Sequence, residues 1–379
     1  MCWYDFTRIS MIRTAFFQDK KCFPLEALRS WFLESKRSFP WRDSPTPYRV
    51  WVSEVMLQQT RAEVVVPYFL KWMERFPTLQ DLAQARESDV VQLWEGLGYY
   101  SRARNLLAGA RVITEIFGGE IPNDLALLSS IKGIGSYTAN AILAFAFKQK
   151  NPAVDGNVLR VMSRLFAIEE SIDRMNTRRE ITGLCESLLP DQDPQVIAES
   201  FIELGARICK KQPLCEQCPL RSFCTAYRQG TMEQYPVRNT RAAISRLFRA
   251  VVIVLYKDQV LMTKREEKEI MAGLYEFPYY QLPKEDCCDI EKITHLVQKD
   301  YGETLHFVSS LPSQKQVFTR YRVTLFPHVF YTKYSLPNSY TLAELSSLPS
   351  SSGHRRIKET FLVEYHKSLE KMVSCSGDK

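Results

Sequence analysis

Four cysteines close together in the sequence are the first residues with an obvious capacity for chemistry. They follow one another as C-x5-C-x2-C-x5-C, at Cys209, Cys215, Cys218 and Cys224. No apolar signal core is recognisable near the N-terminus, so reduced thiols that hold a metal are favoured over disulfides. Four thiolates suit either tetrahedral zinc or an iron–sulfur cluster, and spacing alone does not choose between the two. Unrelated buried thiols are the remaining alternative.

Two carboxylates lie in unlike surroundings. Glu54 stands in the apolar stretch VWVSEVML, where desolvation raises the pKa of a carboxyl and lets it keep a proton near neutral pH. Asp155 begins the turn DGN before an amphipathic helix, and a helix N-terminus favours an ionised carboxylate. A proton donor and an ionised carboxylate in one site form a general acid–base pair. The plainer alternatives are a surface carboxylate for Glu54 and a helix N-cap for Asp155.

Two glycines separate two helical patterns in the stretch LSSIKGIGSYTANAILAFAF. Gly133 and Gly135 permit a tight turn, after which the next helix points free N–H groups outward. A DNA phosphate fits such a turn, and Lys132 is placed to contact phosphate. Gly-x-Gly turns also join helices for packing reasons alone, so the hairpin is weak evidence by itself.

The hydrophobic pattern changes once along the chain. From residue 25 to 227 apolar residues recur at helical spacing, with Pro47 opening one predicted helix and Asp124 capping another. From about residue 247, β-rich runs such as AVVIVLY predict an α+β domain. Between them, residues 228–245 contain Pro, Gly and several Arg without a strong period, which predicts a linker.

The composition favours a folded protein with an acidic partner. The 379 residues are 45% apolar and carry a formal net charge of +7, which suits nucleic acid. The longest uncharged apolar stretch, between Lys132 and Lys148, is shorter than the roughly 18 residues needed to span a bilayer, so no membrane segment is expected. Residues 1–24 are interpreted as an N-terminal extension, with Met11 as a possible translation start and a targeting peptide as the alternative. Residues 371–379 are interpreted as a tail.

Several separated motifs together resemble a known family. FPWR, PYRVWVSEVMLQQT, WEGLGYYSRARNL, GIGSYTANAI and AVDGNVLRV precede the four-cysteine loop. In this order they resemble the endonuclease III superfamily of base excision DNA glycosylases, and within it the adenine DNA glycosylases of the MutY type. The resemblance implies an all-α helix-hairpin-helix domain over 25–227 with a [4Fe-4S] loop at 209–224, and a Nudix-like α+β domain over 246–370. One departure is the first cysteine gap, which is five residues instead of the family's usual six.

The resemblance also implies roles for individual residues. Glu54 corresponds to the acid that protonates the leaving adenine. Asp155 corresponds to the carboxylate that stabilises the oxocarbenium-like sugar, either electrostatically or through a transient covalent bond. Tyr137 and Asn157 are placed beside Asp155 as orienting groups. Three further residues are placed near the adenine pocket, namely Arg37, Arg42 and Glu199.

Tyr137 carries a second implication. By resemblance it occupies the position of the lysine that bifunctional members of the superfamily use as an amine nucleophile. A phenol cannot form a Schiff base. A monofunctional glycosylase that leaves an abasic site is therefore predicted.

A base inside a duplex must be flipped out of the stack before its bond to the sugar can be reached. Gln58, Gln59 and Thr60 end the predicted helix of Glu54, where amide side chains can wedge into the stack and bond the partner base. Tyr99 matches the family's intercalating aromatic residue. A polar helix end and ordinary core packing are the corresponding alternatives.

The second domain is predicted to recognise DNA without cutting nucleotides. The metal-binding pattern of working Nudix hydrolases, G-x5-E-x7-R-E-x2-E-E, does not occur between residues 245 and 379. In the family this domain recognises 8-oxoguanine opposite adenine through a short F-S-H element. The matching stretch here is VFTRY, in which Thr319 keeps a hydroxyl and Arg320 replaces histidine; an ordinary strand is the alternative.

The expected function is excision of adenine opposite 8-oxoguanine or guanine in double-stranded DNA during base excision repair. We expect a DNA-associated monomer in the bacterial cytoplasm. An endonuclease III-like pyrimidine glycosylase/lyase is disfavoured by Tyr137, by Glu54 in its motif and by the extra domain. A non-catalytic DNA-damage sensor is disfavoured by the presence of both carboxylates, and a zinc-bound adaptor leaves the carboxylate motifs unexplained.

Overall fold

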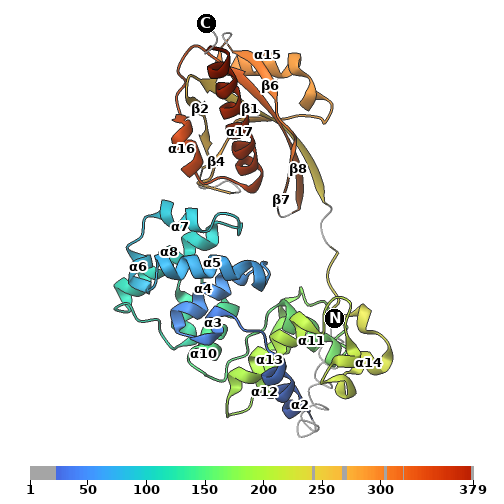
Figure 1. Ribbon diagram of the computed structural model, residues 1–379. Helices are drawn as coiled ribbons and strands as arrows, with labels where there is room; N and C mark the ends of the chain where they lie inside the picture. The colour runs from blue at the N-terminus through green and yellow to red at the C-terminus, as the bar shows by residue number, and fades with distance from the viewer. Residues whose placement is uncertain (1–22, 241–243, 267–270, 303–304, 319, 377–379) are drawn as a thin grey trace, which may run out of the picture. The chain divides into compact units, whose positions relative to one another are not determined.

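The computed structural model describes residues 23–240, 244–266, 271–302, 305–318 and 320–376 (Figure 1). The chain divides into two compact units, one of residues 1–84 and 105–240 and the other of residues 85–104 and 241–379. Residues 1–22 of the predicted extension and the predicted 8-oxoguanine reader Thr319 lie outside the described residues.

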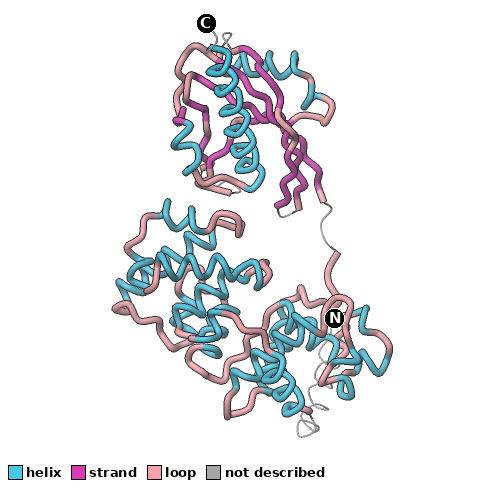
Figure 2. The backbone as a smooth tube through the Cα atoms, in the orientation of Figure 1, coloured by secondary structure: helices cyan, strands magenta, loops and turns pink. Residues whose placement is uncertain are grey.

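The first unit is built from helices, and its described residues include no strand (Figure 2). This confirms the all-α prediction for the N-terminal half. The helices are α2 (Leu25–Ser35), α3 (Pro40–Asp43), α4 (Pro47–Leu57), α5 (Ala62–Arg75), α6 (Leu79–Ala83), α8 (Ser101–Ile116), α9 (Leu125–Ser130), α10 (Ser136–Phe145), α11 (Gly156–Leu165), α12 (Met175–Leu188), α13 (Pro194–Arg207) and α14 (Thr225–Gln229). Helix α8 begins in the second unit, which also contains α7 (Glu87–Leu93).

Helix α4 is buried along almost its whole length. Pro47 opens it as predicted, and the Thr46 hydroxyl caps it by accepting a hydrogen bond from the Arg49 N–H at 3.3 Å. From Tyr48 to Met56 every residue except Arg49 is buried, because α4 packs between α5 and α10. An apolar core helix therefore carries the carboxyl of Glu54.

The hairpin between α9 and α10 requires glycine at position 133. Gly133 has a φ of +93°, and a Cβ atom there would lie 2.6 Å from the Cβ of Asn105. Both the left-handed backbone and the close approach exclude a larger residue. Asp124 caps α9 as predicted, since its carboxylate accepts from the Leu127 N–H at 2.9 Å. The turn brings Tyr137 into the first turn of α10.

Part of the predicted linker is bound to the helical unit. The Val237 carbonyl accepts from the Ile172 N–H at 3.0 Å. The Arg164 guanidinium donates to the carbonyls of Met232 and Tyr235 at 2.9 and 3.2 Å, and Tyr235 is buried. A segment without a hydrophobic period can still be held in place by hydrogen bonds to its backbone carbonyls. Residues 231–239 therefore pack on the first unit.

The second unit is an α+β fold, as predicted. Its seven-stranded sheet has the order β6-β8-β1-β2-β9, with β5 paired to β1 and β7 to β8. The two long central strands, β1 and β8, are parallel, and the other pairings in this sheet are antiparallel. The strands are β1 (Ser245–Tyr256), β2 (Gln259–Leu261), β5 (Tyr279–Gln281), β6 (His306–Ser310), β7 (Gln314–Phe318), β8 (Tyr321–Tyr331) and β9 (Ser339–Thr341), with β3 (Thr263–Lys264) and β4 (Tyr275–Glu276) in a separate pair.

Helices cover both faces of this sheet. Alternate residues of β1 face opposite sides, so Val251 and Ile253 join one core cluster and Val252 joins another. The first cluster includes Ile357 and Phe361 of α17 (Ser352–Ser376), and also Leu345 of α16 (Leu342–Ser347). The second includes residues of α15 (Ile290–Tyr301). Because α17 continues to Ser376, the predicted tail at 371–379 begins inside a helix.

No helix in the described ranges is both long enough and apolar enough to cross a membrane.

Candidate active site

Most of the predicted site residues line one cleft in the helical unit. They come from α3, α4, α10, α11, α13 and the segments beside these helices, which lie far apart in the sequence. Tertiary packing therefore creates the site. The predicted residues that line the cleft are Arg37, Arg42, Glu54, Gln58, Gln59, Thr60, Tyr137, Asp155, Asn157 and Glu199.

Glu54 is a buried carboxyl with one phenol partner. It is 7% exposed, and the Tyr137 hydroxyl donates a hydrogen bond to its Oε2 at 2.7 Å. Burial raises the pKa of Glu54 to about 7; the charges of Asp155 and Glu199 add to this rise, whereas the Tyr137 hydrogen bond and Arg42 oppose it. The carboxyl thus exchanges its proton near neutral pH. Burial also raises the pKa of Tyr137 well above its ordinary value, so the phenol keeps its hydrogen.

Asp155 caps α11 and receives three hydrogen bonds. Its Oδ1 accepts from the N–H groups of Asn157 and Val158, each at 2.8 Å, and its Oδ2 accepts from the Asn157 amide at 2.7 Å. Burial raises the pKa of Asp155, while these donors and the charge of Arg160 oppose the rise. The donors favour the ionised form, as predicted for a helix start. Burial acts in the opposite direction, and it is decided by packing that the local sequence does not reveal.

Arg160 holds the amide that faces Asp155. Its guanidinium donates to Asn157 Oδ1 and to the Gly205 carbonyl, each at 2.9 Å, and to the Cys209 carbonyl at 2.7 Å. The amide of Asn157 is therefore oriented with its N–H toward Asp155. Sequence reasoning missed Arg160, although it stands one helical turn after Asn157, where side chains meet on a helix surface.

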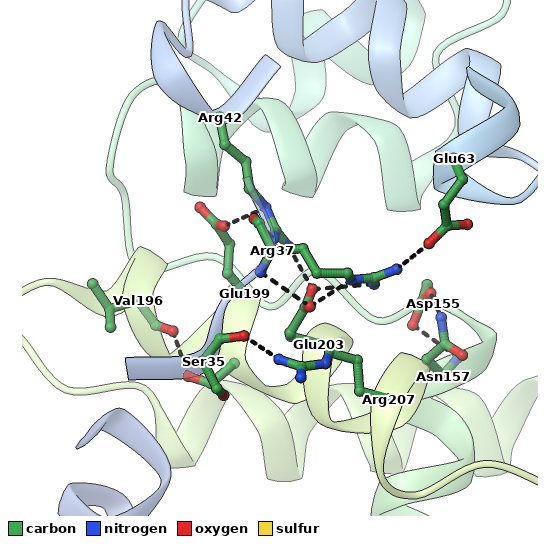
Figure 3. Close-up of polar contacts among 11 residues, drawn as sticks. Ser35, Arg37, Arg42, Glu63, Asp155, Asn157, Val196, Glu199, Glu203 and Arg207 are labelled. Atoms are coloured by element: carbon green, nitrogen blue, oxygen red, sulfur yellow. Dashed lines mark hydrogen bonds and ion pairs between the residues drawn. The ribbon is translucent and has the colours of Figure 1, made fainter. Parts of the chain in front are cut away.

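An ion-pair cluster lies along α13 at the edge of the cleft. Figure 3 shows Glu203 between Arg37 and Arg42, with Glu199 beside Arg42. Arg42 pairs with Glu199 at 3.0 Å and with Glu203 at 3.1 Å, and Arg37 pairs with Glu203 at 2.7 Å. Arg37 also reaches Glu63 at 2.7 Å.

Glu203 is the member of this cluster that sequence reasoning missed. Its side chain is fully buried. Burial pushes the pKa of Glu203 upward, but hydrogen bonds and charges from Arg37 and Arg42 outweigh burial and hold this pKa below its ordinary value. By contrast, burial raises the pKa of Glu199 despite the charge of Arg42. The available signal was the i,i+4 spacing of Glu199 and Glu203 on one helix face.

The residues predicted to contact DNA lie in several places. Gln58 ends α4, and Gln59 follows it exposed, with a left-handed φ of +59°. Lys132 is exposed on the hairpin turn, outside the lining of the cleft. Tyr99 belongs to the second unit, is 47% exposed and has a φ of +50°.

The four cysteines of the loop line one cavity. Val161, Arg164 and Leu204 contribute to its wall together with Cys209, Cys215, Cys218 and Cys224. These four cysteines are free thiols, as are Cys185, Cys287 and Cys288. Burial, together with the neighbouring sulfurs, raises the pKa of Cys218 to about 12. Neighbouring thiols with raised pKa values need positive charge to become thiolates, which a bound metal would supply.

Zinc and an iron–sulfur cluster make different demands on four thiols. Within the described residues, no three His, Cys, Asp or Glu side chains converge on a single metal ion. A [4Fe-4S] cluster is held by one thiolate at each of four irons, so its sulfurs stand farther apart than those around one zinc ion. The four thiols that line this cavity are the donor set that a [4Fe-4S] cluster requires.

The fold and this cleft define a helix-hairpin-helix base excision DNA repair protein. The family model described as HhH-GPD superfamily base excision DNA repair protein matches residues 52–187, and a NUDIX domain model matches residues 250–360. An adenine DNA glycosylase of Buchnera aphidicola (Schizaphis graminum) is 31% identical over 291 residues, covering 74% of this chain and 84% of that protein. The chain belongs to the adenine DNA glycosylase family.

Two other comparisons also find DNA glycosylases. The human adenine DNA glycosylase is 43% identical over 218 residues, which cover 55% of this chain and 40% of the human protein. The structure of a thermostable thymine-DNA glycosylase covers 57% of this chain and 99% of its own, with 25% identity and a TM-score of 0.52. The chain spans about half the length of some relatives, 40% of the human and 54% of the Arabidopsis thaliana protein. Since relatives are both bacterial and eukaryotic, the bacterial cytoplasm stays a prediction.

Proposed function

We propose that this protein excises adenine opposite 8-oxoguanine or guanine from double-stranded DNA. One observation carries the proposal: a single cleft holds a buried carboxyl whose pKa is about 7 and a second carboxylate that accepts three hydrogen bonds. The proposal that the released base is adenine rests on the relatives, which are adenine DNA glycosylases. The opposing 8-oxoguanine or guanine and the monomeric state rest on the family resemblance.

Glu54 acts as the general acid. Breaking the N-glycosidic bond leaves negative charge on the base, and a proton from Glu54 to a ring nitrogen of adenine removes that charge as the bond breaks. A pKa of about 7 suits this task because part of the population is protonated at neutral pH. The Tyr137 hydroxyl, at 2.7 Å from Oε2, orients the carboxyl and leaves Oε1 for the base.

Asp155 stabilises the sugar left behind. The transition state carries positive charge on the deoxyribose, and an ionised carboxylate close to it lowers its energy. The donors from Asn157 and Val158 keep the carboxylate in one orientation. Water then adds to the sugar carbon and loses a proton, and ionised Glu54 is the base available to accept it. The products are free adenine and an abasic site.

The same arrangement favours a monofunctional reaction. Tyr137 stands where a lyase lysine is expected from the resemblance, and its hydroxyl is engaged with Glu54. The cleft therefore offers a phenol and two carboxyls to the sugar and no amine from this position.

Two residues proposed to face DNA have strained backbones. Gln59 and Tyr99 are non-glycine residues in the left-handed region, a conformation that costs free energy and recurs at functional sites. We assign Gln59, with Gln58 and Thr60, to the gap left by the flipped nucleotide and Tyr99 to stacking on bases. Thr319 is assigned to the recognition of 8-oxoguanine.

The cysteine loop is assigned a [4Fe-4S] cluster. Cys209, Cys215, Cys218 and Cys224 would hold it, one at each iron. A bound cluster would fix the loop that carries Lys210 and Lys211. Those cations are then positioned to contact DNA phosphate.

A strand-cleavage assay tests the proposal. Duplexes with adenine opposite 8-oxoguanine, guanine, cytosine or thymine are incubated with the protein and analysed with and without alkali. Cleavage of the adenine strand opposite 8-oxoguanine and guanine, seen only after alkali, is expected. Cleavage without alkali together with a borohydride-trapped lysine adduct would show a lyase, and release of a pyrimidine instead of adenine would refute the substrate.

A further inference from the structure

The turn that carries Tyr99 is strained and partly exposed. Tyr99 is 47% exposed and has a φ of +50°, and Gly98 before it has a φ of +71°. Two consecutive left-handed residues, one of them with a bulky side chain, cost free energy unless their surroundings hold them. The groups that hold this turn therefore decide where the Tyr99 ring points.

Arg102 holds the turn through its backbone carbonyls. The residue lies in the first turn of α8 and is 8% exposed. Its Nη2 donates to the carbonyls of Leu97 and Gly98, each at 3.0 Å. Its guanidinium also lies over the Tyr99 ring, 5.7 Å from the ring centroid. One side chain therefore contacts both the backbone before Tyr99 and the ring itself.

Trp94 supports the same turn from the protein interior. It is fully buried, and its Nε1 donates to the Gly98 carbonyl at 3.0 Å. The Arg102 guanidinium lies over the Trp94 ring as well, 5.1 Å from its centroid. The Gly98 carbonyl thus accepts hydrogen bonds from both Trp94 and Arg102, and a buried ring fixes the guanidinium that reaches Tyr99.

The place of Arg102 is unfavourable for a cation in two ways. A positive charge in the first turn of a helix opposes the helix dipole. Burial lowers the pKa of Arg102 to about 10, because a buried guanidinium loses solvation. Neither cost benefits α8 itself. What the charge provides is the set of contacts with the turn and with the Tyr99 ring.

We propose that Arg102 is a positioning residue that holds Tyr99 in the orientation needed to stack on a base beside the mispair. This inference rests on the stacking role assigned to Tyr99 under the proposed function. A ring that is fixed before DNA arrives loses less conformational freedom when it enters the stack, which favours binding. Opening a stack costs least beside a mispaired base, so the gain should fall mainly on mispaired duplex.

Fluorescence of 2-aminopurine tests the positioning role in the full-length protein. This base is placed beside the mispair of adenine with 8-oxoguanine, once on each side, and its fluorescence changes when its stacking partner changes. The target adenosine carries a 2′-fluorine, which destabilises a cationic sugar and blocks base release. Stacking is therefore measured whether or not the protein releases adenine, and an unmodified duplex tests the proposed function separately.

Three variants give the expected pattern. Arg102→Gln should lose at least half of the fluorescence change on binding and weaken binding of the mispaired duplex at least fivefold, with less than a twofold effect on matched duplex. Gly98→Ala should also lower the fluorescence change: a Cβ there meets no atom within 4 Å, but the left-handed backbone disfavours alanine. Arg111→Gln, the matched control, removes an exposed arginine of α8 that donates to the Ala83 carbonyl, and should change neither quantity.

A double-mutant cycle with Tyr99→Leu separates positioning from general destabilisation. If Arg102 acts through Tyr99, Arg102→Gln should change binding less than twofold once residue 99 is leucine, whereas a purely structural role would weaken both backgrounds equally. Thermal unfolding checks that each variant is folded, and Gly98→Ala carries the same cycle if Arg102→Gln is not. Equal losses in both backgrounds, a wild-type fluorescence change in Arg102→Gln, or a signal that Tyr99→Leu leaves unchanged would each overturn the proposal.

Discussion

The chemistry of Glu54 follows from where α4 places it. A carboxyl on a solvated helix face keeps its ordinary pKa, but α4 is enclosed by α5 and α10, and water is largely excluded around Glu54. The phenol of Tyr137 supplies one directed hydrogen bond and cannot neutralise the charge. A buried carboxyl without a directly bound cation contributes little to stability. Its raised pKa instead suits it to act as an acid.

The acid role of Glu54 predicts a pH profile. The reactive form is protonated, so the single-turnover rate of adenine release should be highest below about pH 7 and fall as pH rises through the pKa of about 7. Glu54→Gln should lose about 100-fold or more in rate at every pH, because an amide cannot deliver the proton. Quenched-flow gels at pH 5.5 to 9 measure both. A Glu54→Gln enzyme with the wild-type rate would assign the acid to another residue.

The same pKa shift has a consequence for stability with a definite sign. Because the folded pKa is above the unfolded value, ionisation opposes folding; this cost begins above pH 4.5 and is complete above about pH 7. At about 1.4 kcal/mol per pKa unit, it reaches about 3 kcal/mol. The free energy of unfolding of Glu54→Gln relative to wild type should therefore be higher at pH 8 than at pH 5, as measured by urea denaturation. An equal difference at both pH values would contradict the shift.

The substitution Asp155→Asn tests the negative charge of Asp155 while it leaves the shape of the side chain nearly unchanged. The side chain keeps its volume and can still cap α11 through its oxygen, but the negative charge beneath the sugar is gone. We expect adenine release to fall by at least 100-fold while binding of the mismatched duplex changes by less than about threefold. Single-turnover gels and fluorescence anisotropy measure the two quantities. Equal losses in rate and binding would assign Asp155 a structural role only.

At the scale of elements, α13 holds the segment after α2 against the cleft. Arg207 near its C-terminus donates to the Ser35 carbonyl, and Asp193 before its first turn pairs with Arg29 at 3.2 Å. Between these ends, Glu199 and Glu203 hold Arg42 and Arg37. The position of the predicted adenine-pocket residues therefore depends on one helix and its ion pairs.

Glu203→Gln tests this dependence. Removing a fully buried carboxylate leaves Arg37 and Arg42 without their shared partner, which should lower the free energy of unfolding by about 2 to 4 kcal/mol. Adenine release should slow as well, because Arg42 is no longer fixed. Glu63→Gln is the matched control: it removes an exposed partner of the same Arg37 and should cost less than about 1 kcal/mol. Urea denaturation in which both variants cost the same would refute the special role of Glu203.

At the scale of the whole molecule, the cysteine loop closes the helical unit. Arg164 of α11 joins the loop to the helical unit, since it donates to the Lys210 carbonyl at 2.5 Å and to Cys209 Sγ at 3.3 Å. Arg160 bonds the Cys209 carbonyl and the Asn157 amide. Loss of the cluster should consequently affect the folded unit and its cleft together.

Metal analysis tests the cluster. Purified protein should contain about four irons per chain with broad absorbance near about 400 nm, as expected for a [4Fe-4S] centre. Cys218→Ser should lose most of the iron, whereas Cys288→Ser, which changes an exposed cysteine outside the loop, should keep it. One zinc per chain without iron would refute the cluster and favour the tetrahedral alternative.

Local patterns were sufficient for much of this protein. Helical and strand periods, Pro47 and Asp124 at helix starts and the glycine at the hairpin are short-range signals, because each depends on neighbours within one or two turns. The same holds for the cap that Asp155 forms. The separated motifs also pointed to the family before any contact between them was known.

Packing between distant segments decided the rest. Whether Glu54 is buried depends on α5 and α10, and the cluster of Arg37, Arg42 and Glu203 joins the segment after α2 to α13, far along the chain. Arg160 and the bound stretch at 231–239 were missed for the same reason, since carbonyl acceptors have no signature in sequence. The pKa of a carboxyl depends on every group around it in space, so only the tertiary structure determines it.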